Sequence, residues 1–162
     1  MAQVDFFLKI DDVKGESTDH KHKEEIDVES WSWGVSQAGT AGHGGGGGAG
    51  KALPQDFHFV KRFDKASPVL FINCTTGKHF KLATLTARKA GEGQQEYLTI
   101  KMEDVMVSSY QVGGAGASSV VPNDQISLNF AKLEILYKEQ KPDGTLGGEV
   151  KQKYDFAANK KV

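Results

Sequence analysis

The sequence predicts a mainly β protein: an antiparallel β-barrel with one short α-helix and a long glycine-rich loop. Apolar residues alternate with polar ones along most of the chain, and clusters of Gly, Pro, Asn and Asp separate these runs, as expected for antiparallel strands. Only residues 67–77 show a helical pattern. Residues 35–51 consist mostly of glycine and alanine, which predicts a long loop.

Two strands precede this loop. The first covers residues 4–10, where alternation puts four apolar side chains on one face: Val4, Phe6, Leu8 and Ile10. In the second strand, Trp31 and Trp33 share one side, where we expect burial. Ser30 and Ser32 therefore face outward.

A third strand and the helix follow the loop. Residues 56–63 form the strand and place three phenylalanines in phase: Phe57, Phe59 and Phe63. Ser67 as N-cap, Pro68 at the first helical position and Gly77 as the stop predict the helix.

The remaining sequence alternates again. We expect strands near residues 79–89, 96–111, 124–138 and 150–157, separated by glycine-rich turns. In the third of these strands the apolar residues change phase between positions 130 and 133, which predicts a bulge or bend there.

Composition sets the broad class. A chain of 162 residues with 38% hydrophobic content can fill one core, so we expect residues 1–162 to form a single domain. A net charge of −1 gives no global field to attract nucleic acid or an anionic membrane. The single cysteine, Cys74, cannot form an intramolecular disulfide, and we expect a buried thiol in a protein from a reducing compartment. The amino terminus lacks the pattern of a signal peptide, and no segment is apolar enough to cross a membrane.

Residues 45–51, GGGGAGK, match the spacing of a phosphate-binding loop. That motif needs Ser or Thr after the lysine and then a helix, but Ala52, Leu53 and Pro54 follow here. We interpret the match as a by-product of the glycine run and expect no bound nucleotide.

His20 and His22 lie one residue apart, with Asp19, Glu24 and Glu25 nearby. This set offers possible metal ligands, but no second group of Cys or His is spaced to complete a structural site. We expect a solvated charged stretch and no metal or other cofactor. Because no local catalytic signature is present either, the sequence favours a protein that is not an enzyme.

Many short segments, taken together, resemble one family. They are VDFFLKIDDVKGES at the start, HKEEIDVESWSWGVSQ, the glycine loop closing with AGK, DFHFVKRFDKASPVLFINCTTGKHF, RKAG with EYL after it, and LNFAKLEILY near the end. In this order they are similar to the hemolysin-coregulated proteins, Hcp, which form the tube of the bacterial type VI secretion system. The resemblance extends over nearly the whole chain.

The resemblance implies a β-barrel similar to phage tail tube proteins. It implies a hexameric ring, stacking of rings into a tube, a VgrG-like spike at the tube tip and a contractile sheath around it. It also implies small effector proteins carried in the lumen, and a location in the bacterial cytoplasm before secretion by the type VI system. Because the chain ends about where the barrel should, at Val162, we expect the plain tube form.

Several residues are candidates for contacts in such an assembly. A glycine loop laid over a neighbour would gain order, so we expect residues 39–51 between subunits or rings. The proposed contacts there are Gly39, His43, Gly45, Gly48 and Lys51. For ring stacking, the candidates are Gly91 in the turn at residues 90–94 and the carboxyl-terminal lysines, Lys160 in particular. Lysines on a terminal strand can equally protect a sheet edge. Ser30 and Ser32 are candidates for cargo contact in the lumen.

Two alternatives belong to other classes of protein. A monomeric β-barrel module that binds a small ligand or glycan would have a pocket with exposed Trp or Tyr side chains. An enzyme with a dispersed site would bring ionisable side chains together in a cleft, which sequence order alone does not reveal.

Overall fold

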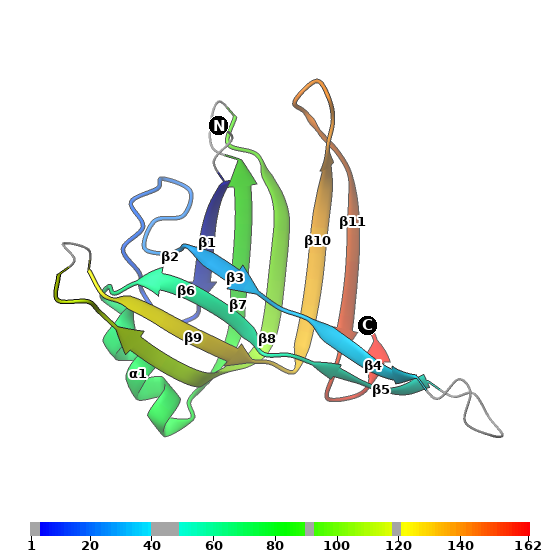
Figure 1. The fold of residues 1–162 in the computed structure, drawn as a ribbon. Helices are drawn as coiled ribbons and strands as arrows, with labels where there is room; N and C mark the ends of the chain where they lie inside the picture. The colour runs from blue at the N-terminus through cyan, green and yellow to red at the C-terminus, as the bar shows by residue number, and fades with distance from the viewer. Residues whose placement is uncertain (1–3, 40–48, 90–92, 118–120) are drawn as a thin grey trace.

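The computed structural model describes residues 4–39, 49–89, 93–117 and 121–162. It contains two antiparallel β layers and one helix (Figure 1). The strands are β1 (Val4–Ile10), β2 (Ile26–Val28), β3 (Ser30–Ser32), β4 (Val35–Gly39), β5 (Ala49–Pro54), β6 (Phe57–Arg62), β7 (His79–Lys89), β8 (Glu96–Gly113), β9 (Asn123–Asn129), β10 (Lys132–Gln140), β11 (Leu146–Asp155) and β12 (Lys160–Lys161). The helix is α1 (Ala66–Thr76).

The first layer has the strand order β2-β1-β7-β8-β10-β11-β12, and the second has the order β3-β6-β9-β8. All the pairings are antiparallel. The 18-residue strand β8 belongs to both layers, because its first part pairs with β7 and β10 and its last part pairs with β9. The prediction of an antiparallel, mainly β fold is confirmed.

The sheet does not close into a continuous barrel. At the corner opposite β8, strand β2 pairs with β1 whereas β3 pairs with β6, so the chain passes from one layer to the other at Glu29. The Glu29 backbone N–H donates to the Val60 carbonyl oxygen at 2.8 Å. The molecule is therefore a two-layered, barrel-like structure joined at two corners.

One hydrophobic core fills the space between the layers. Phe57 and Phe59 of β6 are fully buried, as predicted from their alternation. Trp31 stacks on Phe57 with ring centroids 5.8 Å apart, and both Trp31 and Trp33 pack against this core while Ser30 and Ser32 are exposed. Other core residues are Leu8, Ile10, Ile26, Leu70, Leu85, Ile100, Met102, Val105, Ile126 and Leu128.

Several local predictions are confirmed and others are corrected. The predicted bend lies at Phe130 and Ala131, which separate β9 from β10. Gly77 ends α1 in the left-handed conformation with φ 68°. Ser67 is not the N-cap, because Lys65 holds that position and the buried Ser67 side chain bonds elsewhere. Phe63 follows the end of β6 and is 44% exposed.

The region predicted as loop is shorter than expected. Residues 35–39 and 49–54 form the antiparallel strands β4 and β5, which pair with each other from Val35 and Pro54 outward to Gly39 and Ala49. Their sequences lack apolar alternation, so the pattern did not indicate strands. No helix in the described part of the chain has the length and apolarity needed to cross a membrane.

Candidate assembly surfaces

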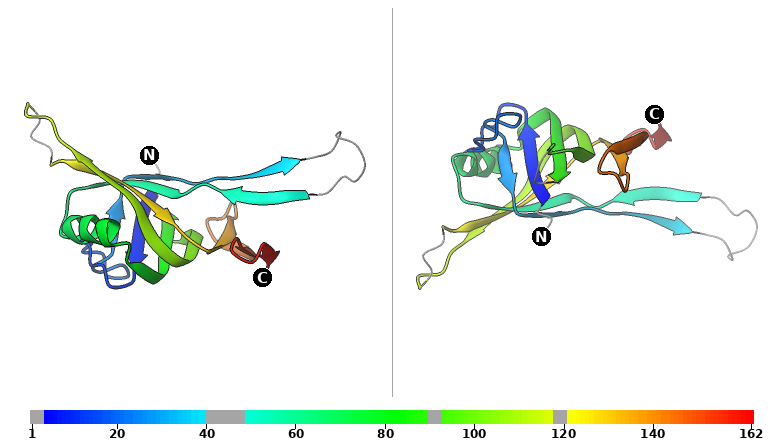
Figure 2. Two further views of the ribbon diagram at one scale, coloured as in Figure 1. Left: turned by 90° about the horizontal axis from the view of Figure 1, so that it is seen from below. Right: turned by 90° about the horizontal axis from the view of Figure 1, so that it is seen from above.

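The β4–β5 hairpin, which we call the arm, projects from the two-layered body (Figure 2). It continues the direction of β3 and β6 beyond the core (Figure 1). Val35 and Leu53 of the arm are 51% and 55% exposed. Because two strands alone bury little surface, an isolated hairpin is marginally stable in water. The arm thus presents apolar side chains that its own chain leaves uncovered.

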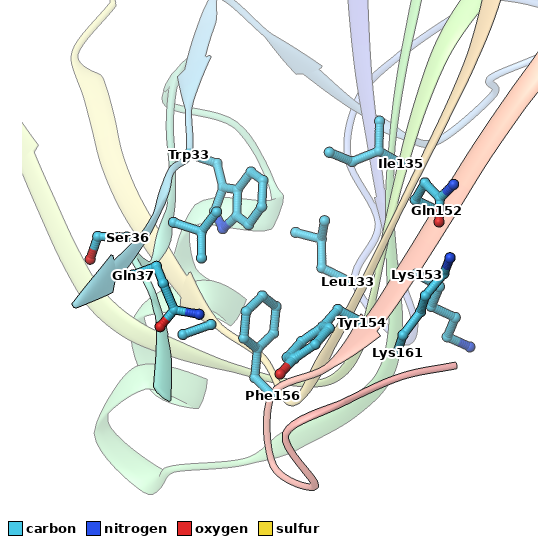
Figure 3. Close-up of a pocket in the computed structure, with 12 residues that line it drawn as sticks. Trp33, Ser36, Gln37, Leu133, Ile135, Gln152, Lys153, Tyr154, Phe156 and Lys161 are labelled. Carbon is cyan, nitrogen blue, oxygen red and sulfur yellow. The ribbon is translucent and has the colours of Figure 1, made fainter. Parts of the chain in front are cut away.

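A groove of about 660 Å³ lies between the root of the arm and the edge of the first layer (Figure 3). The wall on the arm side consists of Trp33, Val35, Ser36, Gln37 and Ala52. The opposite wall comes from β10, β11 and the carboxyl-terminal segment, with the side chains of Leu133, Ile135, Gln152, Lys153, Tyr154, Phe156 and Lys161. Most of this lining is apolar or aromatic, so water contact is unfavourable there.

Two lysines lie on the far wall of this groove. The Lys153 ammonium pairs with Glu103 at 3.0 Å, whereas Lys161 has no ion pair among the described residues. Lys160, next to it, is exposed on β12 and pairs through its backbone with Asp155. The carboxyl-terminal lysines therefore flank the groove and carry its positive charge.

The outer face of the second layer has a different character. Two rows of residues aligned across β3, β6, β9 and β8 form its centre, and we call these rows the polar face. One row contains Ser30, Val60, Gln125 and Gln111, and the other contains Ser32, His58, Ser127 and Ser109. Within these described rows there is no Asp, Glu, Lys or Arg. The His58 Nδ1 lies 3.2 Å from the Ser127 Oγ.

The predicted contact residues fall in several places. Lys51 is exposed on β5, and Gly39 ends β4. His43, Gly45, Gly48 and Gly91 lie outside the described residues. The two predicted stacking regions lie at opposite ends of the first layer: β7 ends at Lys89, beside the turn, whereas β11 ends at Asp155 (Figure 1).

The helix α1 forms a further apolar surface, on the side of the body away from the arm (Figure 2). The helix carries no charged residue, and Phe71 and Ile72 are 52% and 50% exposed. Sequence analysis missed this surface, although an unbroken apolar run from Val69 to Ile72 cannot bury every side chain on one helical face. Cys74 is half-buried against the core and not fully buried.

The charged stretch with the histidines is exposed at His20, Lys21, Lys23 and Glu24, as predicted, but His22 is the exception and belongs to a set of ionic contacts on the first layer, which we call the clamp. His22 is buried, with Nδ1 2.8 Å from Glu25 and Nε2 2.7 Å from Glu96. Its ring stacks on Phe7 at 4.4 Å. The described residues contain no group of three or more His, Cys, Asp or Glu placed to hold a metal.

Arg88 completes this clamp. Its guanidinium donates to both carboxylate oxygens of Asp19, and one of these bonds, to Oδ1, measures 3.0 Å. This bidentate hydrogen bond holds the pKa of the Asp19 carboxyl well below its usual range. The clamp ties the segment before β2 to the outside of the body.

A second charged cluster is fully buried, between α1 and the second layer. The Lys61 Nζ donates to Asp124 at 2.6 Å, to Asp64 at 2.8 Å and to the Ser67 Oγ at 2.7 Å. Tyr110 donates to Asp124 at 3.0 Å, and burial together with this bond raises the pKa of Tyr110 to about 12. Lys61 continues the inward phase of Phe57 and Phe59, which was the signal for its burial. The cluster leaves no open position for a substrate and is structural.

Comparison with known proteins identifies relatives over the whole chain. Residues 7–137 match the family model described as type VI secretion system effector, Hcp. Protein hcp1 of Pseudomonas aeruginosa is 50% identical over 158 residues, which cover 96% of this chain and 97% of that protein.

Solved structures give the same result. The crystal structure of Hcp1 from Salmonella typhimurium matches with a TM-score of 0.83 at 35% identity and covers 100% of both chains. A structure of a type six secretion system protein matches with a TM-score of 0.93 at 31% identity, over 99% of this chain and 100% of the other.

Proposed function

Because the chain belongs to the Hcp family of type VI secretion tube proteins, we propose that it assembles into hexameric rings that stack into a tube and carry effector proteins in the lumen. Residues 1–162 act as one domain in this proposal. The family role is structural, and the proposed function needs no catalytic residue and no cofactor.

The main support for a ring is the arrangement of unpaired edges in the second layer. Strand β3 pairs only with β6, and the last part of β8 pairs only with β9 among the described strands. These two edges lie on opposite sides of the layer and run antiparallel to each other, because three successive antiparallel pairings separate them. Copies placed side by side could therefore continue one antiparallel sheet from subunit to subunit.

Such a contact is heterologous, since it joins two different surfaces of each subunit. Repeated heterologous contacts close into a ring when the rotation per subunit completes a full turn. The same arrangement would turn the polar face of every subunit toward the same side of the continuous sheet. With that side inward, Ser30 and Ser32 line the lumen, and His58 joins them as a cargo-contacting residue.

Stacking needs surfaces at both rims of the ring. The turn at residues 90–94 and the carboxyl-terminal lysines lie at opposite ends of the first layer, so each ring would offer one to the ring above and the other to the ring below. We assign Gly91 and Lys160 to these rims. The partners in the cell are a VgrG-like spike, contractile sheath proteins and small effectors. The protein resides in the bacterial cytoplasm until the type VI system secretes it.

The test of assembly is the mass of the purified protein by size-exclusion chromatography with light scattering, followed by negative-stain imaging. We expect a mass near six subunits and hollow round particles. A monomer at high concentration and low salt would contradict the proposal.

Cargo binding is tested separately by the substitution Ser32→Trp in a ring-forming protein. We expect reduced co-purification of an effector that the wild-type ring retains, because the bulky indole would occupy the polar face. Glu29→Gln, at an exposed position before β3, is the matched control. Equal retention by both variants would remove Ser32 from the cargo surface.

The groove supports one alternative function, a monomeric β-barrel module for a small ligand or glycan. Trp33, Tyr154 and Phe156 give it the aromatic walls that such sites use. This alternative predicts a monomer, so the mass measurement distinguishes it from the ring.

A further inference from the structure

We propose that the groove at the root of the arm receives helix α1 of the neighbouring subunit. This inference rests on the proposed ring and names the two surfaces that meet in it. The first surface is the groove lined by Trp33, Val35 and the aromatic residues of β11 and the segment after it. The second is the exposed face of α1 around Phe71 and Ile72.

The position of the two surfaces carries the inference. Figure 2 shows the arm on one flank of the body and α1 on the opposite flank, and the groove is lined by residues at the root of the arm. The helix lies against β8, one edge strand of the second layer, whereas the groove lies at the root of the arm, which continues β3 and β6 along the strand direction. Because the two surfaces lie on opposite flanks of one subunit, they can meet only between two copies, and such a contact is heterologous, as a ring requires.

The chemistry of the two surfaces also matches. An 11-residue helix without any charged residue, exposing two large apolar side chains, is unusual on a solvated surface. Charged residues are depleted in the buried centre of protein interfaces. The groove offers aromatic and aliphatic walls of the same character, so the contact would remove apolar surface from water on both sides.

Charge complementarity favours a second copy as the occupant. The carboxyl-terminal end of a helix carries partial negative charge, and the last turn of α1 has no basic side chain to balance it. Lys161 on the groove wall has no ion pair among the described residues and supplies a cation of the required sign. A small ligand would not satisfy both the helix and the groove.

A disulfide experiment tests the contact directly. In a Cys74→Ala background, we combine Ile72→Cys on α1 with Val35→Cys on the groove; these positions are 50% and 51% exposed. The two cysteines lie on opposite flanks of one subunit, so they can join only through a neighbour. Oxidation should give a ladder of covalent multimers on non-reducing gels. Each single-cysteine variant alone should remain monomeric on the gel, and an equal mixture of the two should give only dimers.

The matched control replaces Val35→Cys by Val150→Cys, which lies outside the groove and is 63% exposed. We expect at least tenfold less cross-linked product from the control pair. Light scattering on the same samples distinguishes failure of the helix contact from failure of the ring. Hexamers with no excess of groove cross-links would overturn the helix contact and leave the ring intact. A monomeric double-cysteine protein and a monomeric wild type would overturn both.

A second measurement does not depend on cysteine geometry. Phe71→Glu places a charge at the centre of the proposed contact, on a residue that is 52% exposed and packs edge-on against Tyr110. We expect the protein to need at least tenfold higher concentration to form rings, whereas Val150→Glu should leave assembly unchanged. Equal assembly of these two variants would contradict the inference.

Discussion

The body and the arm of this protein differ in how they gain their order. The body packs two sheets and a helix around a continuous apolar core, and the buried Lys61 ammonium is hydrogen-bonded to Asp64, Ser67 and Asp124. The arm is a two-stranded hairpin that leaves Val35 and Leu53 exposed beside an apolar groove. The body therefore buries its apolar side chains within its own chain, whereas the arm leaves apolar side chains exposed, as expected for a surface that contacts a partner.

The largest effect should come from the buried cluster of the body. Lys61→Met leaves Asp124 buried without its cationic partner, and we expect a loss of about 3–5 kcal/mol in the free energy of unfolding. Urea denaturation measures it, with the exposed Lys65→Met as control. If the two variants unfolded alike, the body would not depend on this cluster.

Two adjacent residues of α1 differ in burial and should therefore differ in their effects on stability and on assembly. Leu70 is fully buried, so Leu70→Ala should cost about 2–5 kcal/mol of stability through lost burial and a cavity. Phe71, at 52% exposure, should cost much less on replacement by alanine but should weaken assembly. Thermal unfolding of dilute protein and light scattering of concentrated protein give the two readouts. A large loss of stability in Phe71→Ala would place this residue in the body.

Deleting residues 42–48 tests the arm alone. We expect the unfolding free energy of the dilute monomer to change by less than about 0.5 kcal/mol, because the entropy of closing a connection between two strands depends only weakly on its length. Ring formation should require roughly tenfold higher concentration, equivalent to about 1.4 kcal/mol. The measurement is light scattering over a dilution series. Unchanged ring formation would show that this part of the chain makes no subunit contact.

The smallest effect concerns the clamp on the outside of the body and diminishes on acidification. The depressed pKa of Asp19 means that its bond to Arg88 stabilises the fold at pH above the unfolded pKa of about 3.9 and that this contribution is lost as pH falls below it. Asp19→Asn should therefore be less stable than wild type at pH 6, with a narrower difference at pH 3. Urea midpoints at both values measure this difference, and a gap that stays constant would contradict the assignment.

The sequence pattern predicts the strands of the body far better than the strands of the arm. Alternation located β1, β6 and β7, and the change of phase located the break between β9 and β10, because these strands have one face in the core. It missed β4 and β5, whose residues pack against little in their own chain and so need no alternation. The burial of His22 was also unpredictable, since it depends on Glu96, 74 residues away in the sequence.

The candidate surfaces also differ in how far the sequence predicts them. Alternation correctly placed Ser30 and Ser32 on the exposed side of β3. The groove was not predictable, because Trp33, Leu133 and Phe156 meet only after the chain has folded. The exposed face of α1 left a signal in its four consecutive apolar residues, which exceed what one buried stripe can hold.

The uncharged polar face has a consequence for transport. Across the two rows that hold Ser30, Ser32, Gln125 and Ser127, a passenger would meet no charged side chain, whereas Arg62 lies beyond these rows on the same face of β6. Its affinity for the wall would come from short-range hydrogen bonds that water can replace one at a time. Acidic and basic passengers would then bind these two rows with similar strength.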